Sequence, residues 1–371
     1  MQVRLALAFL TSLCVAGGVW LSSEPVAAQA GSAARRPSTI QRLPDGKPDL
    51  QGTFDISFIT PLERPVELGN RLTFTQAEAD ALEQYEIQRN EKSAEPSSAD
   101  RGAPPVGGET STPKSYLEIL FRAGGGAVGG YNNFWLAPGT QVVTVDGQKR
   151  TSIIVDPPDG RIPPMKPEAK QRVAALRARA VDPSAAEGGA AAGPMSAFEN
   201  PEQRPLAERC LLGFGSTSGP PTLPNYFYNN LKQIVQTRDT ILILVEMVHD
   251  ARIVRMNATH LAPGVRKWMG DSIGRWEGDT LVVDTTNFTD KTQFQGASRD
   301  LHVVERFTRV DAESILYRFT VEDPNTWERP WSGEYTWRTT QDNIYEYACH
   351  EGNHALANVL SCARYTEKQA R

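Results

Sequence analysis

The chain has 371 residues, of which 40% are hydrophobic and 22% are charged, and its formal net charge is −5. This composition is typical of a globular protein with a sizeable core, and β-barrels of more than about 200 residues commonly form one domain. Because the basic residues form no stripe that would neutralise phosphates, we expect no nucleic-acid partner.

Residues 1–30 are predicted to be a cleaved secretory signal peptide. Arg4 precedes an apolar run, Leu5–Leu21, and small residues up to Ala30 follow it, as in a signal-peptidase site. A membrane anchor is the alternative, but a spanning helix needs about 20 apolar residues, and polar residues and glycines interrupt this run. A polar leader, 31–47, comes next. We therefore expect a periplasmic or secreted protein with no stable membrane insertion after cleavage.

The chain after residue 30 contains three cysteines, Cys210, Cys349 and Cys362. In an oxidising compartment this odd number predicts one disulfide and one free thiol. Three buried, unpaired thiols are the alternative. The spacing does not indicate which two cysteines pair.

Two strands and two helices are expected in the first half of the chain. In chain order they are a strand at 49–59, a helix at 75–90, a strand at 151–155 and a helix at 167–180. The first helix opens on the capping-box pattern Thr75-Gln76-Ala77-Glu78, and the second has a proline in its first turn. Low-complexity loops are predicted near 94–113 and 182–205.

From residue 226 onward, short strands follow one another at close spacing. The predicted strands are 232–237, 240–248, 251–256, 280–288, 301–310, 314–322, 333–338 and 344–349, and a helix is expected over 350–369. Such spacing is typical of an antiparallel sheet rather than of alternating β and α units. We predict a mainly β fold, an antiparallel up-and-down barrel that spans 48–371 as one domain, with helical and disordered insertions and a C-terminal helix.

Aromatic side chains share faces of these strands, because side chains alternate with a period of two. Inward-pointing aromatics would line a cavity for a small, partly apolar ligand, whereas the alternative is that they form a packed core. The candidate ligand-binding residues are Tyr317, Tyr335, Trp337, Tyr345, Tyr347 and Glu351. Glu305 lies between Val303 and Phe307 on one face, where a buried carboxylate would be costly without a partner.

Histidines and carboxylates near strand ends suggest an enzyme as a second hypothesis. The candidate catalytic residues are His249, Asp250, His302 and Glu305. Imidazoles oriented by carboxylates perform general acid–base chemistry, which would make the protein an extracytoplasmic hydrolase or lyase. In the alternative, purely structural interpretation, Asp250 makes a turn and Glu305 pairs with Arg306 or Arg309.

The segment from His350 to His354 has the pattern H-E-x-x-H, which binds zinc when it lies on a helix. Gly352 and Asn353 are poor helix formers, so a capped junction before a helix is the favoured interpretation and zinc the alternative. The chain has no nucleophile elbow, phosphate loop or dinucleotide fingerprint in a fitting context, so we expect no nucleotide cofactor.

Four segments resemble those of a large group of exported acidobacterial and proteobacterial proteins that has no settled activity. These segments are Pro48–Thr53, Arg150–Pro163, Gly274–Val283 and Tyr347–Asn353. Gly52-Thr53-Phe54 also resembles the G-x-W motif in the first strand of lipocalin and calycin barrels, with phenylalanine in place of tryptophan. That resemblance implies a barrel that encloses a ligand. A structural or interaction module of the cell envelope is the third hypothesis.

Overall fold

The computed structural model describes residues 40–94, 139–181, 200–204, 206–213, 219–224, 228–292, 294–352 and 354–369. The predicted signal peptide, most of the polar leader and nearly all of the two predicted low-complexity loops lie outside these ranges. All described residues belong to one unit, Ser38–Arg371.

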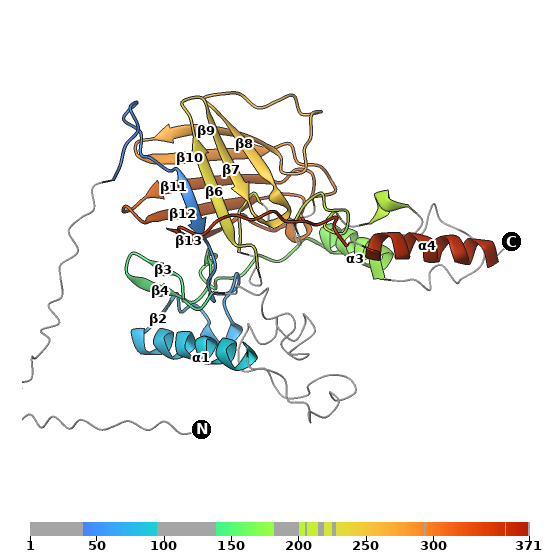
Figure 1. Cartoon of the computed structure of the whole chain (residues 1–371), viewed down its shortest axis with the longest axis horizontal. Helices are drawn as coiled ribbons and strands as arrows, with labels where there is room; N and C mark the ends of the chain where they lie inside the picture. Colours follow the sequence, from blue (N-terminus) through green and yellow to red (C-terminus); the bar gives the residue numbers. More distant parts are fainter. Residues whose placement is uncertain are drawn as a thin grey trace, which may run out of the picture. The chain divides into compact units, whose positions relative to one another are not determined.

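Nine strands close into a β-barrel (Figure 1), which confirms the predicted mainly β fold. They pair in the order β1-β6-β7-β8-β9-β10-β11-β12-β13, and β1 closes the ring by pairing with β13 as well as with β6. The strands are β1 (Gly52–Asp55), β6 (Leu231–Gln236), β7 (Thr240–Val245), β8 (Ala251–Met256), β9 (Asp271–Glu277), β10 (Thr280–Thr286), β11 (His302–Arg309), β12 (Ser314–Glu322) and β13 (Trp331–Thr339). A tenth strand, β5 (Ile154–Asp156), pairs with β13 beside the closure.

One neighbouring pair in the barrel is parallel, which departs from a strict up-and-down meander. The chain leaves β8, runs back along the barrel through 257–270, and enters β9 in the same direction as β8. β9 was not predicted from the sequence. A strand was predicted at 344–349, and this prediction is wrong, since 340–349 has no regular secondary structure. Because β12 pairs with one edge of β13 and β1 and β5 with the other, β13 has no free edge for another strand.

The interior of the barrel is aromatic, as the alternation predicts. Tyr317, Phe319, Tyr335 and Trp337 are at most 2% exposed. The ring centroids of Tyr317 and Tyr335 lie 5.1 Å apart, and those of Tyr317 and Trp337 lie 5.3 Å apart. Contacts of this kind stabilise a core beyond the burial of area alone.

Among the described residues, a three-stranded sheet and three α-helices lie outside the barrel. The sheet has the order β2 (Thr73–Phe74), β4 (Gln148–Arg150), β3 (Thr144–Val145), and the helices are α1 (Gln76–Ala94), α3 (Pro167–Val181) and α4 (His354–Gln369). Short 3-10 helices occur at Val66–Leu68, Pro201–Gln203, Met247–His249 and Phe294–Gly296. The capping box forms as predicted, because the backbone N–H of Thr75 donates to Glu78 Oε2 at 2.8 Å and that of Glu78 donates to Thr75 Oγ1 at 3.3 Å.

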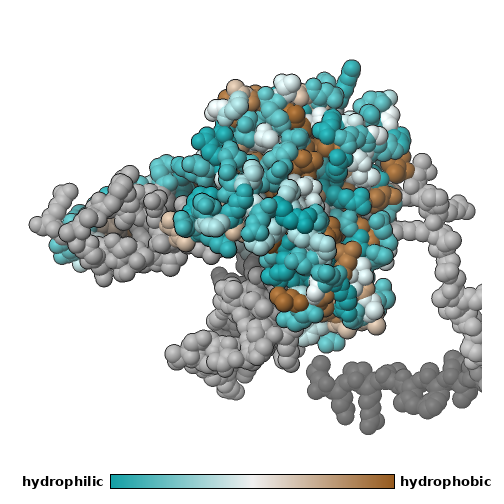
Figure 2. Space-filling view, turned by 180° about the vertical axis from the view of Figure 1, so that it is seen from behind, coloured by the Kyte–Doolittle hydropathy of each residue, from teal (hydrophilic) through white to brown (hydrophobic). Residues whose placement is uncertain are grey.

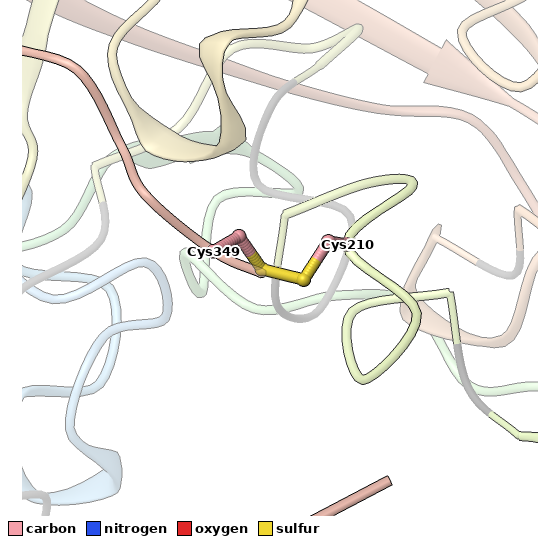
Figure 3. Close-up of a disulfide and its surroundings, with 2 residues drawn as sticks. All are labelled: Cys210 and Cys349. Carbon is pink, nitrogen blue, oxygen red and sulfur yellow. A yellow bond between two sulfur atoms is a disulfide. The ribbon is translucent and has the colours of Figure 1, made fainter. Parts of the chain in front are cut away.

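A disulfide joins Cys210 to Cys349, with Cα atoms 5.8 Å apart (Figure 3). Cys362 on α4 is a free, exposed thiol. The prediction of one disulfide and one free cysteine is therefore confirmed. The bond links the segment before β6 to the segment that follows β13. None of the helices in the described part of the chain has the length and apolar character needed to cross a membrane.

Candidate functional site

The two ends of the barrel differ in how their strands are connected. At one end, short turns join β6 to β7, β9 to β10 and β11 to β12. At the other, which we call the loop end, lie the connections 246–250 and 323–330, the described parts 287–292 and 294–301 of the connection between β10 and β11, and residues 219–224 and 228–230, which precede β6. Loops held by a rigid scaffold commonly carry binding and catalytic residues, so the loop end is the place to look for a site.

The segment 219–224 enters the barrel and is held there by two tyrosines. The backbone N–H of Thr222 donates to the Tyr317 hydroxyl at 2.9 Å, and the Tyr335 hydroxyl donates to the Thr222 carbonyl at 2.5 Å. Thr222 is fully buried. Two of the four predicted ligand-binding tyrosines, Tyr317 and Tyr335, therefore point inward, where their hydroxyls bind the chain itself.

Glu305 faces the interior and is compensated there by Arg252 of β8. Both terminal nitrogens of the Arg252 guanidinium donate hydrogen bonds to the carboxylate, and Nη2 lies 2.9 Å from Oε1. The Tyr317 hydroxyl donates a further hydrogen bond to Oε1 at 2.8 Å. The carboxylate is 0% exposed and the guanidinium side chain 3%. Burial raises the pKa of Tyr317 well above its ordinary value, and the charge of Glu305 adds to this. The alternative in which Glu305 pairs with Arg306 or Arg309 is wrong.

Lys232 is a further charged residue on the inner wall, besides Glu305 and Arg252. It lies on β6, opposite Phe54 of β1 and Val245 of β7, and is fully buried. Its Nζ has no hydrogen-bond partner in the part of the chain that the structure describes. Burial lowers the pKa of Lys232 to about 7, although the negative charges of Glu246 and Asp55 act to raise it. A buried ammonium without a partner is costly, so this group stands out.

Lys232 was not among the site residues predicted from the sequence, although the sequence contains a signal for it. Lys232, Ile234 and Gln236 alternate on β6, and all three are buried. The period of two therefore puts the lysine on the same face as the isoleucine. Because lysine is rarely buried, a lysine on the apolar face of a predicted strand could have been selected as a candidate site residue.

The structure does not bring the four predicted catalytic residues together. Glu305 and His302 are three positions apart on β11, so they face opposite sides of the barrel wall. His249 and Asp250 lie at the loop end, between β7 and β8. Val248 and His249 both have left-handed backbone conformations, with φ of 61° and 47°. A β-branched residue in this region is strained, and such strain concentrates at functional sites.

His302 instead belongs to a cluster on the outer wall, which we call the His–Asp cluster, formed by His260, Asp271, Asp284 and His302. The Nε2 atoms of His260 and His302 lie 3.0 Å and 3.2 Å from the same Asp284 oxygen, Oδ1. Nδ1 of His260 lies 3.3 Å from Asp271 Oδ2. The hydrogen bond with Asp284 raises the pKa of His302, and the same bond lowers the pKa of Asp284. Only His302 of this cluster was a predicted site residue.

The predicted zinc motif is not a continuous helical turn. His350 lies in a turn and is exposed, whereas His354 is the first residue of α4. Glu351, a predicted ligand-binding residue, is also exposed in that turn. Within the described ranges, no group of three or more His, Cys, Asp or Glu residues is arranged to hold a metal ion.

The other predicted ligand-binding residues lie in different surroundings. Trp337 is fully buried in the barrel, and Tyr345 is 72% exposed outside it. Tyr347 packs at the loop end against Val245, Met247 and Val248. The fold thus brings Tyr317, Tyr335 and Trp337 together, and leaves the residues after β13 outside the barrel.

A cavity of about 440 Å³ lies between the outer wall of the barrel and the segment 139–144. Its lining residues are Asp55, Ser57, Phe58, Gly139, Thr140, Gln141, Val142, Val143, Thr144, Thr336 and Arg338. The volume is in the range of small-molecule sites. None of the predicted ligand-binding residues lines it. Figure 2 shows one face of the molecule that is mostly hydrophilic, with apolar residues singly or in small groups.

Together these features define a closed, mostly antiparallel β-barrel with an aromatic interior, a buried ion pair, and a buried lysine whose Nζ has no hydrogen-bond partner among the described residues. No protein-family model matches the chain, and neither a curated protein nor a solved structure matches it.

Proposed function

We propose that the barrel binds a small, partly apolar ligand from its loop end, with a hydrogen-bond-accepting group of the ligand at Lys232. The observation that carries the proposal is the buried Nζ of Lys232, which has no partner among the described residues. Burying a polar or charged group without a hydrogen bond costs on the order of several kcal/mol, and a ligand oxygen at Nζ would remove that cost.

The surroundings support a partly apolar ligand. Phe54 and Val245 lie on either side of Lys232 in the sheet register. The hydroxyl of Thr222 is a second buried polar atom without a hydrogen-bond partner in the described chain. An apolar wall with a few polar groups that lack partners is the usual composition of a small-molecule site.

The test uses prodan, a fluorescent aromatic ketone that is neutral and accepts a hydrogen bond. We expect saturable binding of one prodan per chain, and about tenfold weaker binding by Lys232→Met, since a lost hydrogen bond is worth about 1.4 kcal/mol. Lys291→Met is the matched control, because Lys291 is exposed. Unsaturable binding, or equal affinity of Lys232→Met and the unchanged protein, would contradict the proposal.

The second candidate function is the hydrolase or lyase, now centred on the His–Asp cluster. The specific observation is that one oxygen of Asp284 contacts Nε2 of both histidines, which fixes the orientation of both rings. General acid–base groups contribute about 10²–10⁴-fold to a rate. If the cluster is catalytic, Asp284→Asn lowers p-nitrophenyl acetate hydrolysis at least tenfold, whereas His354→Ala leaves it unchanged. Equal rates for the two variants would remove this candidate.

We also propose that the protein works outside the cytoplasm, in the periplasm or after secretion. The disulfide between Cys210 and Cys349 supports this, because such bonds persist mainly in oxidising compartments.

A further inference from the structure

We propose that Lys232 forms a reversible covalent imine with an apolar aldehyde or ketone held in the barrel. The inference rests on the proposed ligand binding, and it identifies the chemical class of the ligand. Its geometrical basis is a buried amine on the inner wall, without a hydrogen-bond partner in the described chain and with a buried carboxylate as its neighbour.

The nucleophile is the neutral amine, and Lys232 is suited to supply it. Its pKa of about 7 leaves about half of the amine neutral at pH 7. A lysine with an ordinary pKa of about 10.4 is only about 0.04% neutral at that pH. Lys232 therefore offers roughly a thousandfold more free amine than an ordinary exposed lysine. A lysine in an apolar site is activated in this way for imine formation.

Glu246 is the acid–base group that the reaction requires. It is 6% exposed and follows β7 directly, at the start of the connection to β8. Its side chain accepts a hydrogen bond from the backbone N–H of Leu231, at 3.2 Å from Oε2. Leu231 immediately precedes Lys232, so the carboxylate lies beside the strand position that carries the amine.

The condensation balances without an oxidant or reductant. The lone pair of Nζ attacks the carbonyl carbon, the C=O π electrons move to oxygen, and a proton passes from nitrogen to that oxygen by way of Glu246. The resulting carbinolamine then loses its hydroxyl as water: the remaining N–H proton of Nζ passes by way of Glu246 to the departing oxygen, and the nitrogen lone pair forms the C=N bond. One carbonyl compound and one amine give one imine and one water.

The charges around Lys232 favour a neutral carbonyl ligand over an acid. Two carboxylates, Glu246 and Asp55, already act on the ammonium form. A further carboxylate from a ligand would enter a site whose negative charge already matches or exceeds the charge of the lysine, and like charges disfavour one another there. A carbonyl group adds no charge, and its apolar body can pack against Phe54 and Val245.

The experiment is reductive trapping with trans-cinnamaldehyde and sodium cyanoborohydride at pH 7, followed by intact-mass analysis and peptide mapping. We expect a first adduct on Lys232, formed at least tenfold faster than any adduct on Lys291. Lys291→Met should keep this adduct. Both Lys232→Met and Lys232→Arg should lose it, and the arginine variant retains a cation if the methionine variant does not fold. Glu246→Gln should slow trapping about tenfold, because the acid–base group is lost.

Adducts spread over exposed lysines, or equal trapping by Lys232→Arg and the unchanged protein, would overturn the imine. If prodan binds with the Lys232 dependence described above but no adduct forms, the imine fails and the binding proposal stands. If prodan does not bind, the binding proposal fails as well.

Discussion

Glu305 shows what a single inward residue requires of its surroundings. Its carboxylate is fully buried, and its charge is balanced by Arg252 and a hydrogen bond from Tyr317. The balance depends on all three groups, because a buried charge that loses its partner is far more costly than an exposed one.

We expect Glu305→Gln to lower the free energy of unfolding by about 3–5 kcal/mol, because it leaves the buried Arg252 guanidinium without a counter-charge. Urea unfolding of the variant and of the unchanged protein measures this difference in the free energy of unfolding. The matched control is Glu277→Gln, which breaks exposed ion pairs to Arg275 and Arg306 and should lower the free energy of unfolding far less, because water screens exposed ion pairs. Similar losses for the two variants would contradict the importance assigned to the buried pair.

His302 and Asp284 predict a dependence of stability on pH. The pKa of His302 is raised above 6.5, so its contribution is fully present below pH 6.5 and is lost as the pH rises through the folded-state pKa. The pKa of Asp284 is lowered below 3.8, so its contribution is present above pH 3.8 and is lost as the pH falls through the folded-state pKa. The pair therefore stabilises the fold most between these two values.

The measurement is an NMR titration of the histidine ring protons. In Asp284→Asn the pKa of His302 should fall toward its ordinary value, because the hydrogen bond from the ring to the Asp284 carboxylate, the main reason that this pKa is raised, becomes a bond to a neutral amide. The control is Asp290→Asn, because Asp290 is exposed and lies on the connection between β10, which carries Asp284, and β11, which carries His302. An unchanged His302 titration in Asp284→Asn would refute the assignment.

At the scale of elements, the alternation of apolar and polar residues predicted most of the strands. It failed for β9, where a glycine interrupts the pattern. The predicted ranges 251–256 and 314–322 coincide with β8 and β12. β9 was missed because it begins with Asp271 and Ser272 and contains Gly274, none of which favours a strand on its own. Partners far apart in the sequence also could not be predicted, since Arg252 and Glu305 are separated by 53 positions.

The glycine that obscured β9 is required by the parallel pairing with β8. A Cβ at Gly274 would lie 2.6 Å from Met256 Sδ and 2.8 Å from Val254 Cγ1. We expect Gly274→Ala to lower the free energy of unfolding by about 1–3 kcal/mol, as overpacking of a core does. In the control, Gly264→Ala, the new Cβ meets nothing within 4 Å and its φ is not positive, so unfolding should be unaffected within about 0.5 kcal/mol. Thermal and urea unfolding decide between these outcomes.

At the scale of the whole molecule, closure of the barrel and the disulfide are long-range events. β1 closes the ring by pairing with strands from the second half of the chain, and the disulfide joins residues 139 positions apart. The sequence predicted the barrel and the number of disulfides. It did not indicate the pairing of Cys210 with Cys349, because spacing alone does not place two distant segments side by side.

The disulfide connects the predicted export to the stability of the fold. A cross-link over such a long loop stabilises by about 2–4 kcal/mol, so the Cys210→Ser, Cys349→Ser double variant should unfold at correspondingly lower urea concentration. Cys362→Ser is the control, since that thiol is free and exposed.

The full chain recovered from the periplasm should begin at residue 31 and show one reactive thiol after denaturation. A form lacking residues 1–30 and kept in the cytoplasm should show three. If both preparations show one reactive thiol, the disulfide forms without export. If the exported chain still carries residues 1–30, the predicted signal peptide is not cleaved and that prediction is wrong.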